Sequence, residues 1–585
     1  MATSLIDAET VLAIDVGAVT TRAILFDVVE GRYRFLAVGE APTTLDAPYR
    51  NIGEGVQLAI EQLEQISGYV IIDDSSTLVC PPRSDGVGVD QCVTLFSASH
   101  PLKTVLVGLL DEISITSGRN LLNTTYASVM DTIHLNDRRS ASQRLDAILQ
   151  LRPELILIVG GTEGGASQSM MDMIETVGLA CYLLPKDQRP EILFAGNQQL
   201  AEAVQTAIGK LTSLHTAPNV RPSLEVEQIE PAQTRLVSVY RQSRLRQVPG
   251  ASDLDSWSAG ALTPTATAFG RTIRFISKEY AHSRKGVLGV DVGGTATTVA
   301  AGFGGELSLT VMPNHGLGEG LAGLLELSSM EDILRWLPFQ SNADSVREYI
   351  YTKISYPHSI PATPEDLAME HALTTQILQV AIKRAIRSFP VSARRMQPDL
   401  LPWFEPIIAA GRVFGHAPLP GQTIMMLLNG LQPVGVTTIA LDQNNLAASL
   451  GAAAGVSPLL TIQALDATNF LNLGTVITPV GQATPGTPVL RVKVSYANGS
   501  ENIIDVKNGS LEVIPVPAAQ AARLQVQPLH RFDVGMGGPG VGGKVDVVGG
   551  ALGVIIDARG RPLAMPQDPA RRAEQMKKWL WTLGC

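Results

Sequence analysis

Several kinds of residue are scarce in this chain, and each scarcity excludes a class of protein. Only four cysteines occur among 585 residues, and they form no Cys-x-x-Cys pair: Cys80, Cys92, Cys181 and Cys585. This spacing argues against a disulfide framework and against a cysteine-held iron–sulfur cluster. No run approaches the ~18 uninterrupted apolar residues of a membrane-spanning helix. No membrane span is therefore expected.

Basic charge is scarce as well. The formal net charge is −10, and the chain has no large basic block. This balance argues against a nucleic acid as the main partner. The opening residues MATSLIDAET lack a basic region followed by an apolar stretch, so no signal peptide is expected. A cytoplasmic protein with several hydrophobic cores is the expectation, because 585 residues are too many for one core.

What the chain does contain is one local pattern used twice. Residues 11–23 read VLAIDVGAVTTRA, and residues 287–300 read VLGVDVGGTATTVA. The two stretches align without a gap at an offset of 276 residues. Each predicts a strand that ends in Asp-x-Gly, a tight turn, and a second strand with small hydroxyl residues.

Such a turn exposes several backbone N–H groups, which together can bind phosphate oxygens. Glycine is needed where a side chain would clash with the phosphate or forbid a positive φ angle. The aspartate at each turn, Asp15 or Asp291, can hold a hydrated Mg²⁺, which accepts few protein carboxylates. Two turns suggest two α/β domains closing on one nucleotide, although a duplicated fold with ordinary turns is the simpler alternative.

Two further stretches extend the pattern. PIIAAGRVFG at 406–415 predicts a buried strand running into Ala-Gly-Arg, and NNLAASLGAAAG at 444–455 predicts a helix of small residues. With the two turns, they resemble the acetate kinase/Hsp70/actin superfamily of ATPases. The resemblance implies phosphate sites at Asp15–Arg22 and Asp291–Thr298, an adenosine site at Ala409–Arg412, and a connecting helix at Asn445–Gly455.

The implied ligands are ATP and Mg²⁺. The residues predicted to bind the nucleotide at these motifs are Gly17, Thr20, Thr21, Arg22, Gly293, Gly294, Thr295, Thr297, Gly411 and Arg412. Asp15 and Asp291 are predicted to hold Mg²⁺ through water and to act in catalysis.

A glycine-rich stretch elsewhere is a separate candidate. In VGGTEGG at 159–165, glycines flank Thr162 and Glu163 at the end of a buried strand, where open α/β sheets place ligands. Gly160, Gly161 and Thr162 are predicted to contribute to nucleotide binding, and Glu163 to orient a hydrolytic water or a water on Mg²⁺. The alternative is a strand-to-helix turn with Glu163 as an N-terminal helix carboxylate.

Longer stretches resemble one particular family. They are SASHPLKTVLVGLL, ELILIVGGTEGGASQ, EILFAGN, LTPTATAF, MGGPGVGGKVDVVGGALGVIIDARGRPL and MPQDPARRAEQMKKWL. They are similar to the glutamate mutase (methylaspartate mutase) accessory family MutL, which is unrelated to mismatch repair. That resemblance implies a chaperone-like ATPase that assists an adenosylcobalamin-dependent mutase. The chain departs from the pattern at the first turn, where Ala18 and Val19 stand in place of Gly294 and Thr295.

The expected fold is α/β: two actin-like (ribonuclease H-like) domains closing on a nucleotide, followed by a β-rich C-terminal domain. The predicted boundaries are 1–217 for the first domain with an insertion, 218–285 for a mostly helical connection, 286–455 for the second domain and 456–585 for the C-terminal domain. Within the last, a hairpin turning at Asn498–Gly499 and a terminal helix are predicted. We expect this last region to be dispensable for ATP binding and to contact the partner.

Three functions remain open at this point. The chain is an ATP-hydrolysing factor that remodels a mutase subunit or another protein partner, a small-molecule kinase, or an actin-like scaffold that uses nucleotide as a conformational switch. The whole-length resemblance favours the first. The sequence leaves open which carboxylate positions water, and whether the chain forms a homo-oligomer.

Overall fold

The computed structural model describes residues 10–165, 167–280, 285–466 and 469–585. Nine of the ten opening residues, from which the absence of a signal peptide was expected, therefore lie outside the described residues. In the described ranges, no helix combines the length and the apolar character that crossing a bilayer requires.

The first repeat begins a five-stranded sheet. Its strands are β1 (Val11–Val16), β2 (Thr20–Val29), β3 (Arg32–Pro42), β4 (Gln91–Phe96) and the short β10 (Thr263–Pro264). They lie in the order β10-β4-β1-β2-β3. β1, β2 and β3 are antiparallel, whereas β4 runs parallel to β1 and β10 parallel to β4. Helix α1 (Ile52–Ser67) buries its apolar face against β2 and β3.

The second repeat begins a sheet with the same core. The strands β11 (Gly286–Val292), β12 (Ala296–Phe303), β13 (Glu306–Pro313), β14 (Phe404–Ala410) and β15 (Gly435–Asp442) lie in the order β13-β12-β11-β14-β15. Their directions repeat those of the first sheet. Two sheets with this shared order are the two actin-like domains of the chain.

Helices of the second domain and of the domain boundary complete this unit. The second domain carries α9 (Leu321–Leu327), α10 (Met330–Leu334), α11 (Ala343–Ser355), α12 (Pro364–Ala385), η5 (Ile386–Ser388), α13 (Arg412–Gly415) and α14 (Pro420–Gly430). Between the sheets, α8 (Thr265–Glu279) packs on α15 (Leu446–Ala453), and α16 (Pro458–Asp466) packs on β3. A Cβ on Gly451 would stand 1.9 Å from the Ala268 carbonyl oxygen, so these two helices meet backbone to backbone.

A separate parallel sheet is inserted between β4 and β10. Its strands are β5 (Leu102–Val107), β6 (Ala127–Ile133), β7 (Leu155–Ile158), β8 (Glu191–Phe194) and β9 (Leu214–Thr216), in the order β6-β5-β7-β8-β9. The surrounding helices are η1 (Asp111–Ile115), α2 (Thr116–Leu122), α3 (Ala141–Leu151), α4 (Gln168–Leu183), η2 (Lys186–Gln188), η3 (Gln198–Leu200), α5 (Ala201–Ile208) and α6 (Glu230–Gln247). The next helix, α7 (Ala251–Trp257), packs on α6 and on β4 of the first sheet. The stretches KTVLVGLL and ELILIVGG supply the paired parallel strands β5 and β7, which are mostly buried.

The C-terminal region is β-rich but shares a sheet with the second domain. β16 (Leu471–Thr478), β22 (Val554–Asp557) and β19 (Leu511–Ile514) extend the second sheet beyond β15. β17 (Pro488–Tyr496), β18 (Glu501–Lys507), β20 (Ala521–Pro528) and β21 (Gly543–Val548) form a further antiparallel sheet. The predicted hairpin at Asn498–Gly499 and the terminal helix, α17 (Pro569–Thr582), are confirmed.

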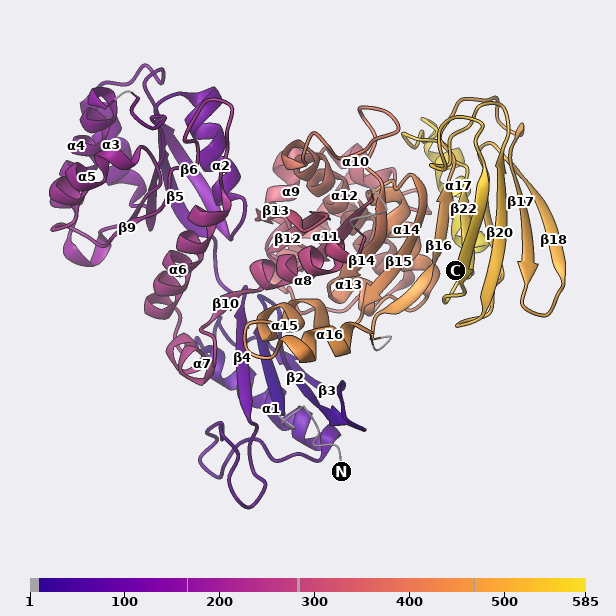
Figure 1. Cartoon of the computed structure of the whole chain (residues 1–585), viewed down its shortest axis with the longest axis horizontal. Helices are drawn as coiled ribbons and strands as arrows, with labels where there is room; N and C mark the ends of the chain where they lie inside the picture. The colour runs from indigo at the N-terminus through magenta and orange to yellow at the C-terminus, as the bar shows by residue number, and fades with distance from the viewer. Residues whose placement is uncertain (1–9, 166, 281–284, 467–468) are drawn as a thin grey trace.

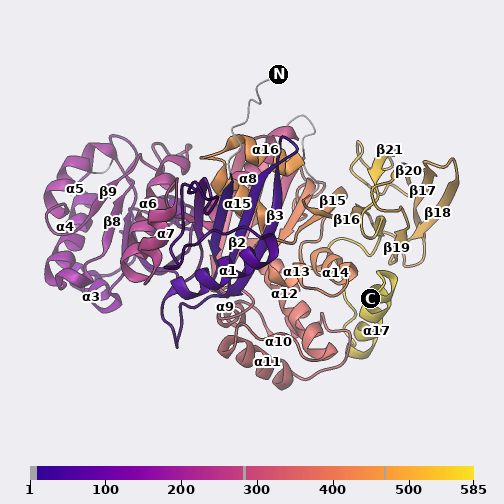
Figure 2. The same ribbon diagram turned by 90° about the horizontal axis from the view of Figure 1, so that it is seen from below.

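A buried charge cluster fastens this region to the second domain. Asp557 pairs with Arg559 and Arg561, and all three side chains have an exposed fraction of 1% or less. Arg559 also donates to Asn429 on α14 and lies over the Trp579 ring of α17. β16, β19 and β22 are thus integral to the sheet of the second domain, and the expectation of a dispensable appendage does not fit this packing. In Figures 1 and 2, this region and the inserted sheet lie at opposite ends of the molecule.

Candidate functional site

The two glycine turns have the same local geometry. In each hairpin the aspartate pairs with the residue seven positions later: Asp15 pairs with Arg22, and Asp291 pairs with Thr298. The N–H of Gly17 donates to the Thr20 carbonyl at 3.1 Å, and that of Gly293 to the Ala296 carbonyl at 3.0 Å. Neither glycine has a positive φ angle.

Close approach of the backbone is what requires glycine in these turns. A Cβ on Gly17 would stand 2.8 Å from the Thr20 carbonyl oxygen, and one on Gly293 would stand 3.1 Å from that of Ala296. Gly411, at the end of β14, does have a positive φ, and its Cβ would stand 2.4 Å from the Val292 carbonyl oxygen. The glycines therefore keep the turns tight and pack the end of β14 against β11.

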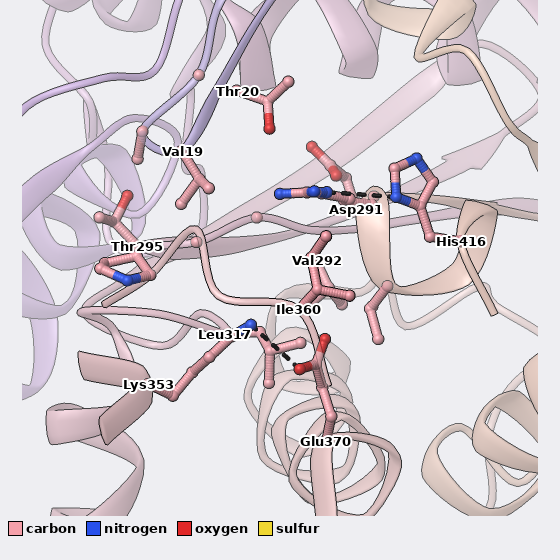
Figure 3. A pocket seen from close by; sticks show the side chains of 18 of the residues that line it. Val19, Thr20, Asp291, Val292, Thr295, Leu317, Lys353, Ile360, Glu370 and His416 are labelled. Atoms are coloured by element: carbon pink, nitrogen blue, oxygen red, sulfur yellow. Dashed lines mark hydrogen bonds and ion pairs between the residues drawn. The ribbon is translucent and has the colours of Figure 1, made fainter. Parts of the chain in front are cut away.

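Both turns face one cavity of about 460 Å³ between the two actin-like domains. Ten of the predicted site residues line it: Asp15, Gly17, Thr20, Arg22, Asp291, Gly293, Gly294, Thr295, Gly411 and Arg412. Figure 3 shows Val19 and Thr20 on one side of this space and Thr295 and Asp291 on the other. Among the described residues, the N–H groups of Ala18, Val19, Gly294 and Thr295 have no protein acceptor. Four unsatisfied donors therefore stand in two turns that line the same cavity.

Two predicted threonines lie behind the cavity wall. Successive side chains alternate across a strand, so Thr21 and Thr297 point away from their neighbours that line the cavity. The Thr21 hydroxyl lies 2.9 Å from that of Thr43, and the Thr297 hydroxyl donates to the His315 carbonyl at 2.6 Å. Both threonines are fully buried and fasten the hairpins from behind.

The two aspartates differ in their surroundings. Asp15 accepts hydrogen bonds from the Thr265 hydroxyl at 2.8 Å and from the Asn445 amide at 2.6 Å. Burial raises its pKa, and the nearby Arg22 opposes that shift. No hydrogen-bond donor among the described residues reaches the Asp291 carboxyl group. Burial, with the charges of Asp15 and Asp442, raises the pKa of Asp291 to about 7.

Two neighbouring groups complete this electrostatic environment, and sequence reasoning gave a role to only one of them. Arg22 donates to Glu40 at 2.6 Å and lies near both aspartates. Asp442, at the end of β15, accepts from the N–H groups of Leu446 and Ala447 at the start of α15. Burial raises the pKa of Asp442 to about 6. An aspartate two residues before a predicted helix is the signal that could have identified it as a partner of the helix N-terminus.

A third wall of the cavity was not predicted. Lys353 on α11 pairs with Glu370 on α12 at 3.1 Å, and its ammonium donates to the Ser359 carbonyl at 2.7 Å. The Tyr349 hydroxyl donates to the same carboxylate at 2.9 Å. Figure 3 shows the Lys353 and Glu370 side chains meeting next to Leu317. Lys353 and Glu370 lie on different helices, so no local motif in the sequence joins them.

The glycine-rich stretch of the inserted sheet lies outside this cavity. Gly160, Gly161, Thr162 and Glu163 follow β7 and are absent from the residues that line it. Glu163 accepts from the Asn219 amide at 2.9 Å and from the N–H of Gln198 at 3.3 Å. Its carboxylate thus joins three segments of the inserted domain. The structure does not bring these four residues together with Asp15 and Asp291.

The end of the inserted sheet is filled by its own side chains. The Ser114 hydroxyl accepts from the N–H groups of Leu109 and Leu110, both at 2.9 Å, and donates to the Leu110 carbonyl. A Cβ on Gly160 would stand 3.1 Å from the Ser114 Cβ. Ser114 therefore satisfies backbone donors beside β7 that would otherwise be free to bind a ligand.

The side chains around the cavity do not by themselves form a complete set of metal ligands among the described residues. Within the described ranges, no group of three or more His, Cys, Asp and Glu side chains is arranged to hold a metal ion. A hydrated Mg²⁺ does not need such a group, because it keeps most of its waters and takes one or two carboxylates. Asp291, which lines the cavity without a hydrogen-bond donor, fits that requirement.

Structural comparison found distant similarity to several solved structures. A nucleotide-free acetone carboxylase shares 12% identity at a TM-score of 0.31, covering 86% of this chain and 81% of the other. Ethanolamine utilization protein EutJ from Carboxydothermus hydrogenoformans shares 10% at 0.26, covering 76% and 89%. Xylulose kinase from Bifidobacterium adolescentis shares 11% at 0.27, covering 77% and 93%.

Comparison with curated proteins gave no significant match. A family model, by contrast, matches most of the chain. The MutL protein model matches residues 11–468, which include both glycine turns, the inserted sheet and both helices between the domains. With the repeated strand order, this match supports a nucleotide-binding protein of the actin-like type. The chain belongs to the MutL protein family.

Proposed function

We propose that the cavity binds ATP with Mg²⁺ and that its hydrolysis drives changes in a partner protein. One observation carries this proposal: both glycine turns, both aspartates and Gly411–Arg412 line the same cavity between two domains. Domains of this kind open and close around a ligand, so binding energy in the cavity is converted into relative motion.

Each group in the cavity has a distinct task in this proposal. The free N–H groups of Gly294 and Thr295 donate to phosphate oxygens, with Thr20 and Thr295 adding hydroxyl donors. The Arg22 guanidinium, held by Glu40, supplies positive charge toward the phosphates. The adenosine lies against Gly411 and Arg412, which line the cavity at the end of β14.

Asp291 is the group we assign to the metal. Burial and two neighbouring carboxylates raise its pKa to about 7, so this part of the cavity holds more negative charge than Arg22 balances. A divalent cation relieves that repulsion. When bound, Mg²⁺ would neutralise phosphate charge. Asp15, whose two oxygens each accept a hydrogen bond, orients the first turn.

The partner we propose is an adenosylcobalamin-dependent mutase such as glutamate mutase. Membership of the MutL family supports this choice, because the family is presumed to serve such enzymes. In this role the protein is a chaperone-like accessory factor, and hydrolysis powers the exchange of a damaged cofactor on the mutase.

Calorimetric titration of ATP in Mg²⁺ buffer tests the binding step, and Asp291→Asn tests hydrolysis. We expect the variant to lose about 10²-fold or more in hydrolysis rate, because charge aimed at the reacting phosphate is removed, while ATP affinity changes less. The matched control is Asp344→Asn, an exposed aspartate on α11 with a side-chain exposure of 90%. Absence of ATP binding would overturn the proposal.

The partner step needs a separate assay. A purified mutase, inactivated by turnover, is incubated with this protein, ATP, Mg²⁺ and free cofactor. Recovery of mutase activity that requires all four supports the accessory role. ATP binding and hydrolysis without recovery would favour the actin-like scaffold over the mutase factor.

A further inference from the structure

One residue that lines the cavity comes from the inserted domain. Tyr126 lies between α2 and β6, and among the described lining residues it alone falls between β5 and β9. It is buried, with an exposed fraction of 6%. Because Tyr126 precedes β6, it stands at the amino edge of this parallel sheet, opposite the edge that carries Glu163. The inserted domain therefore reaches the proposed nucleotide site through this aromatic side chain.

The Tyr126 hydroxyl meets the first turn of α8. It accepts a hydrogen bond from the N–H of Ala266 at 3.1 Å. The first N–H groups of a helix have no acceptor within the helix, so this bond satisfies a donor that is otherwise unpaired. One residue earlier, the Thr265 hydroxyl donates to Asp15 at 2.8 Å. The same helix turn is thus bonded both to the inserted domain and to the aspartate of the first glycine turn.

The aromatic ring of Tyr126 is fixed within the inserted domain. Its centroid lies 5.9 Å from that of the Tyr240 ring on α6. The buried Arg244 lies 5.2 Å from the centroid of the Tyr240 ring. Its guanidinium also donates to the Ser99 hydroxyl at 3.1 Å and lies 3.8 Å from the Glu154 carboxylate. Ser99 belongs to the connection from β4 to β5, so the ring is held where the inserted domain joins the first sheet.

The segment that ends at Tyr126 is also bonded to the second actin-like domain. The carbonyl of Asn123, directly after α2, accepts from the N–H of Val311 on β13 at 2.6 Å. The amide oxygen of Asn123 accepts from Arg384 on α12 at 2.7 Å. Segment 123–126 therefore bonds to the second domain at one end and to the helix between the two sheets at the other. Closing of the two domains on a nucleotide acts directly on this segment.

We infer that Tyr126 is a positioning residue of the nucleotide site, supplied by the inserted domain. Its hydroxyl holds the first turn of α8, and Thr265 on that turn holds Asp15. Asp15 orients the first glycine turn, so Tyr126 sets how well this turn receives a nucleotide. The inference rests on the proposed nucleotide site and adds the inserted domain to it. Because coupling between two sites is reciprocal, a bound nucleotide in turn orders segment 123–126.

Tyr126→Phe tests this role, because it keeps the ring and removes the hydroxyl. In the full chain, calorimetry should show an affinity for ATP and Mg²⁺ about fivefold weaker than in the wild type, the effect of one net hydrogen bond. The KM for ATP should rise by a similar factor. The kcat should change by less than about twofold, because Asp291 and the second glycine turn are untouched.

The matched control is Tyr69→Phe. This change also removes one tyrosine hydroxyl that makes a hydrogen bond, here to Asp27 on β2, and Tyr69 is not among the residues that line the cavity. A general loss of stability affects the two variants alike. ATP affinity and KM should therefore stay at wild-type values in Tyr69→Phe. Equal ATP affinity in Tyr126→Phe and the wild type would overturn the inference.

A double-mutant cycle with Thr265→Val tests whether Tyr126 acts through α8. Valine keeps the shape of threonine and removes the hydroxyl that reaches Asp15. We expect Thr265→Val to weaken ATP binding by about fivefold or more. Adding Tyr126→Phe should then weaken binding further by less than about twofold, since the bond that Tyr126 supports is already lost. Losses that multiply would show two independent contributions and overturn the positioning role.

Amide exchange measures the reciprocal effect. With ATP and Mg²⁺, exchange in peptides that contain Ala266 and β6 should slow by about threefold or more in the wild type, and by less than about twofold in Tyr126→Phe. Equal slowing in both proteins, or none in either, would overturn the inference and leave the nucleotide site standing. Failure of the wild type to bind ATP would overturn the proposed function instead.

Discussion

The first and second glycine turns share a strand register and use their aspartates differently. Asp15 is held by hydrogen bonds from α8 and from the residue that precedes α15. Asp291 has no such donor among the described residues, and burial raises its pKa to about 7. The duplicated backbone thus supports two tasks: the first turn ties the helices between the domains to β1, and the second exposes a carboxylate to the cavity.

The sheets behind the turns differ as well. The first sheet ends at the two-residue strand β10, whereas the second continues past β15 through β16, β22 and β19. These last strands come from the C-terminal region. The second domain therefore depends on strands that follow both glycine turns by more than a hundred positions, whereas the first receives from that part of the chain the helices α15 and α16.

Truncation after Gly455 is the change expected to have the largest effect on the difference between the two domains. The deletion removes three strands of the second sheet, the Asp557 cluster and α16, so we expect aggregated protein or loss of cooperative unfolding, with no nucleotide binding. Circular dichroism and size-exclusion chromatography provide the measurement. Removal of α17 alone should cause a smaller loss, because its packing on β19 and α14 and the ring over Arg559 disappear while the strands remain. A soluble truncated protein that binds ATP would restore the idea of a separable appendage.

Asp15→Asn tests whether the first turn is an anchor. The amide that replaces the carboxylate offers one acceptor where two donors, from Thr265 and Asn445, now converge. Loss of one buried hydrogen bond with an unsatisfied donor costs about 1–3 kcal/mol of unfolding free energy. Urea denaturation should show this loss. An unchanged midpoint would mean that the α8 and α15 contacts do not depend on the Asp15 charge.

Asp291→Asn should have the opposite effect on stability in Mg²⁺-free buffer. A carboxyl group with a raised pKa weakens folding as the pH increases, from its ordinary value near 4 through about 7, because the folded protein must then bury a charge. The variant should melt higher than the wild type at pH 8, and the difference should vanish near pH 4. A variant that melts lower than the wild type at pH 8 would show that the Asp291 charge is stabilised by its surroundings.

The repeated hairpins were predictable from sequence because each is local. Strand, glycine turn and strand lie within about a dozen residues, and the aspartate and glycines stand where the pattern places them. The partners of Asp15 were not predictable in this way. Thr265 is 250 residues away and Asn445 is 430 residues away, and only the folded chain brings them to one carboxylate.

The predicted boundary at residue 456 separates strands that in fact share one sheet, and the reason is that strand pairing is not a local property of the sequence. The residues of β16 and β22 alternate or run apolar as any buried strand does, and nothing local says which sheet they join. Their parallel pairing links segments about 80 residues apart. In the same way, α8 was described as connecting material, although it packs on strands of both actin-like sheets.

Glu163→Gln is expected to have the smallest effect of these changes. It tests whether the carboxyl edge of the inserted sheet acts independently of the two actin-like sheets. The glutamate accepts from Asn219 and Gln198 within the inserted domain and lies outside the cavity lining. A glutamine keeps one acceptor, so we expect a loss of about 0.5–1.5 kcal/mol in the stability of that domain, visible as faster amide exchange after β7 and β8. ATP hydrolysis should stay within about twofold of the wild type, since the catalytic groups are untouched. A loss approaching that of Asp291→Asn would instead place Glu163 beside the nucleotide during turnover. That result would require the inserted domain to swing toward the cavity, and it would make three sheets, not two, responsible for the reaction.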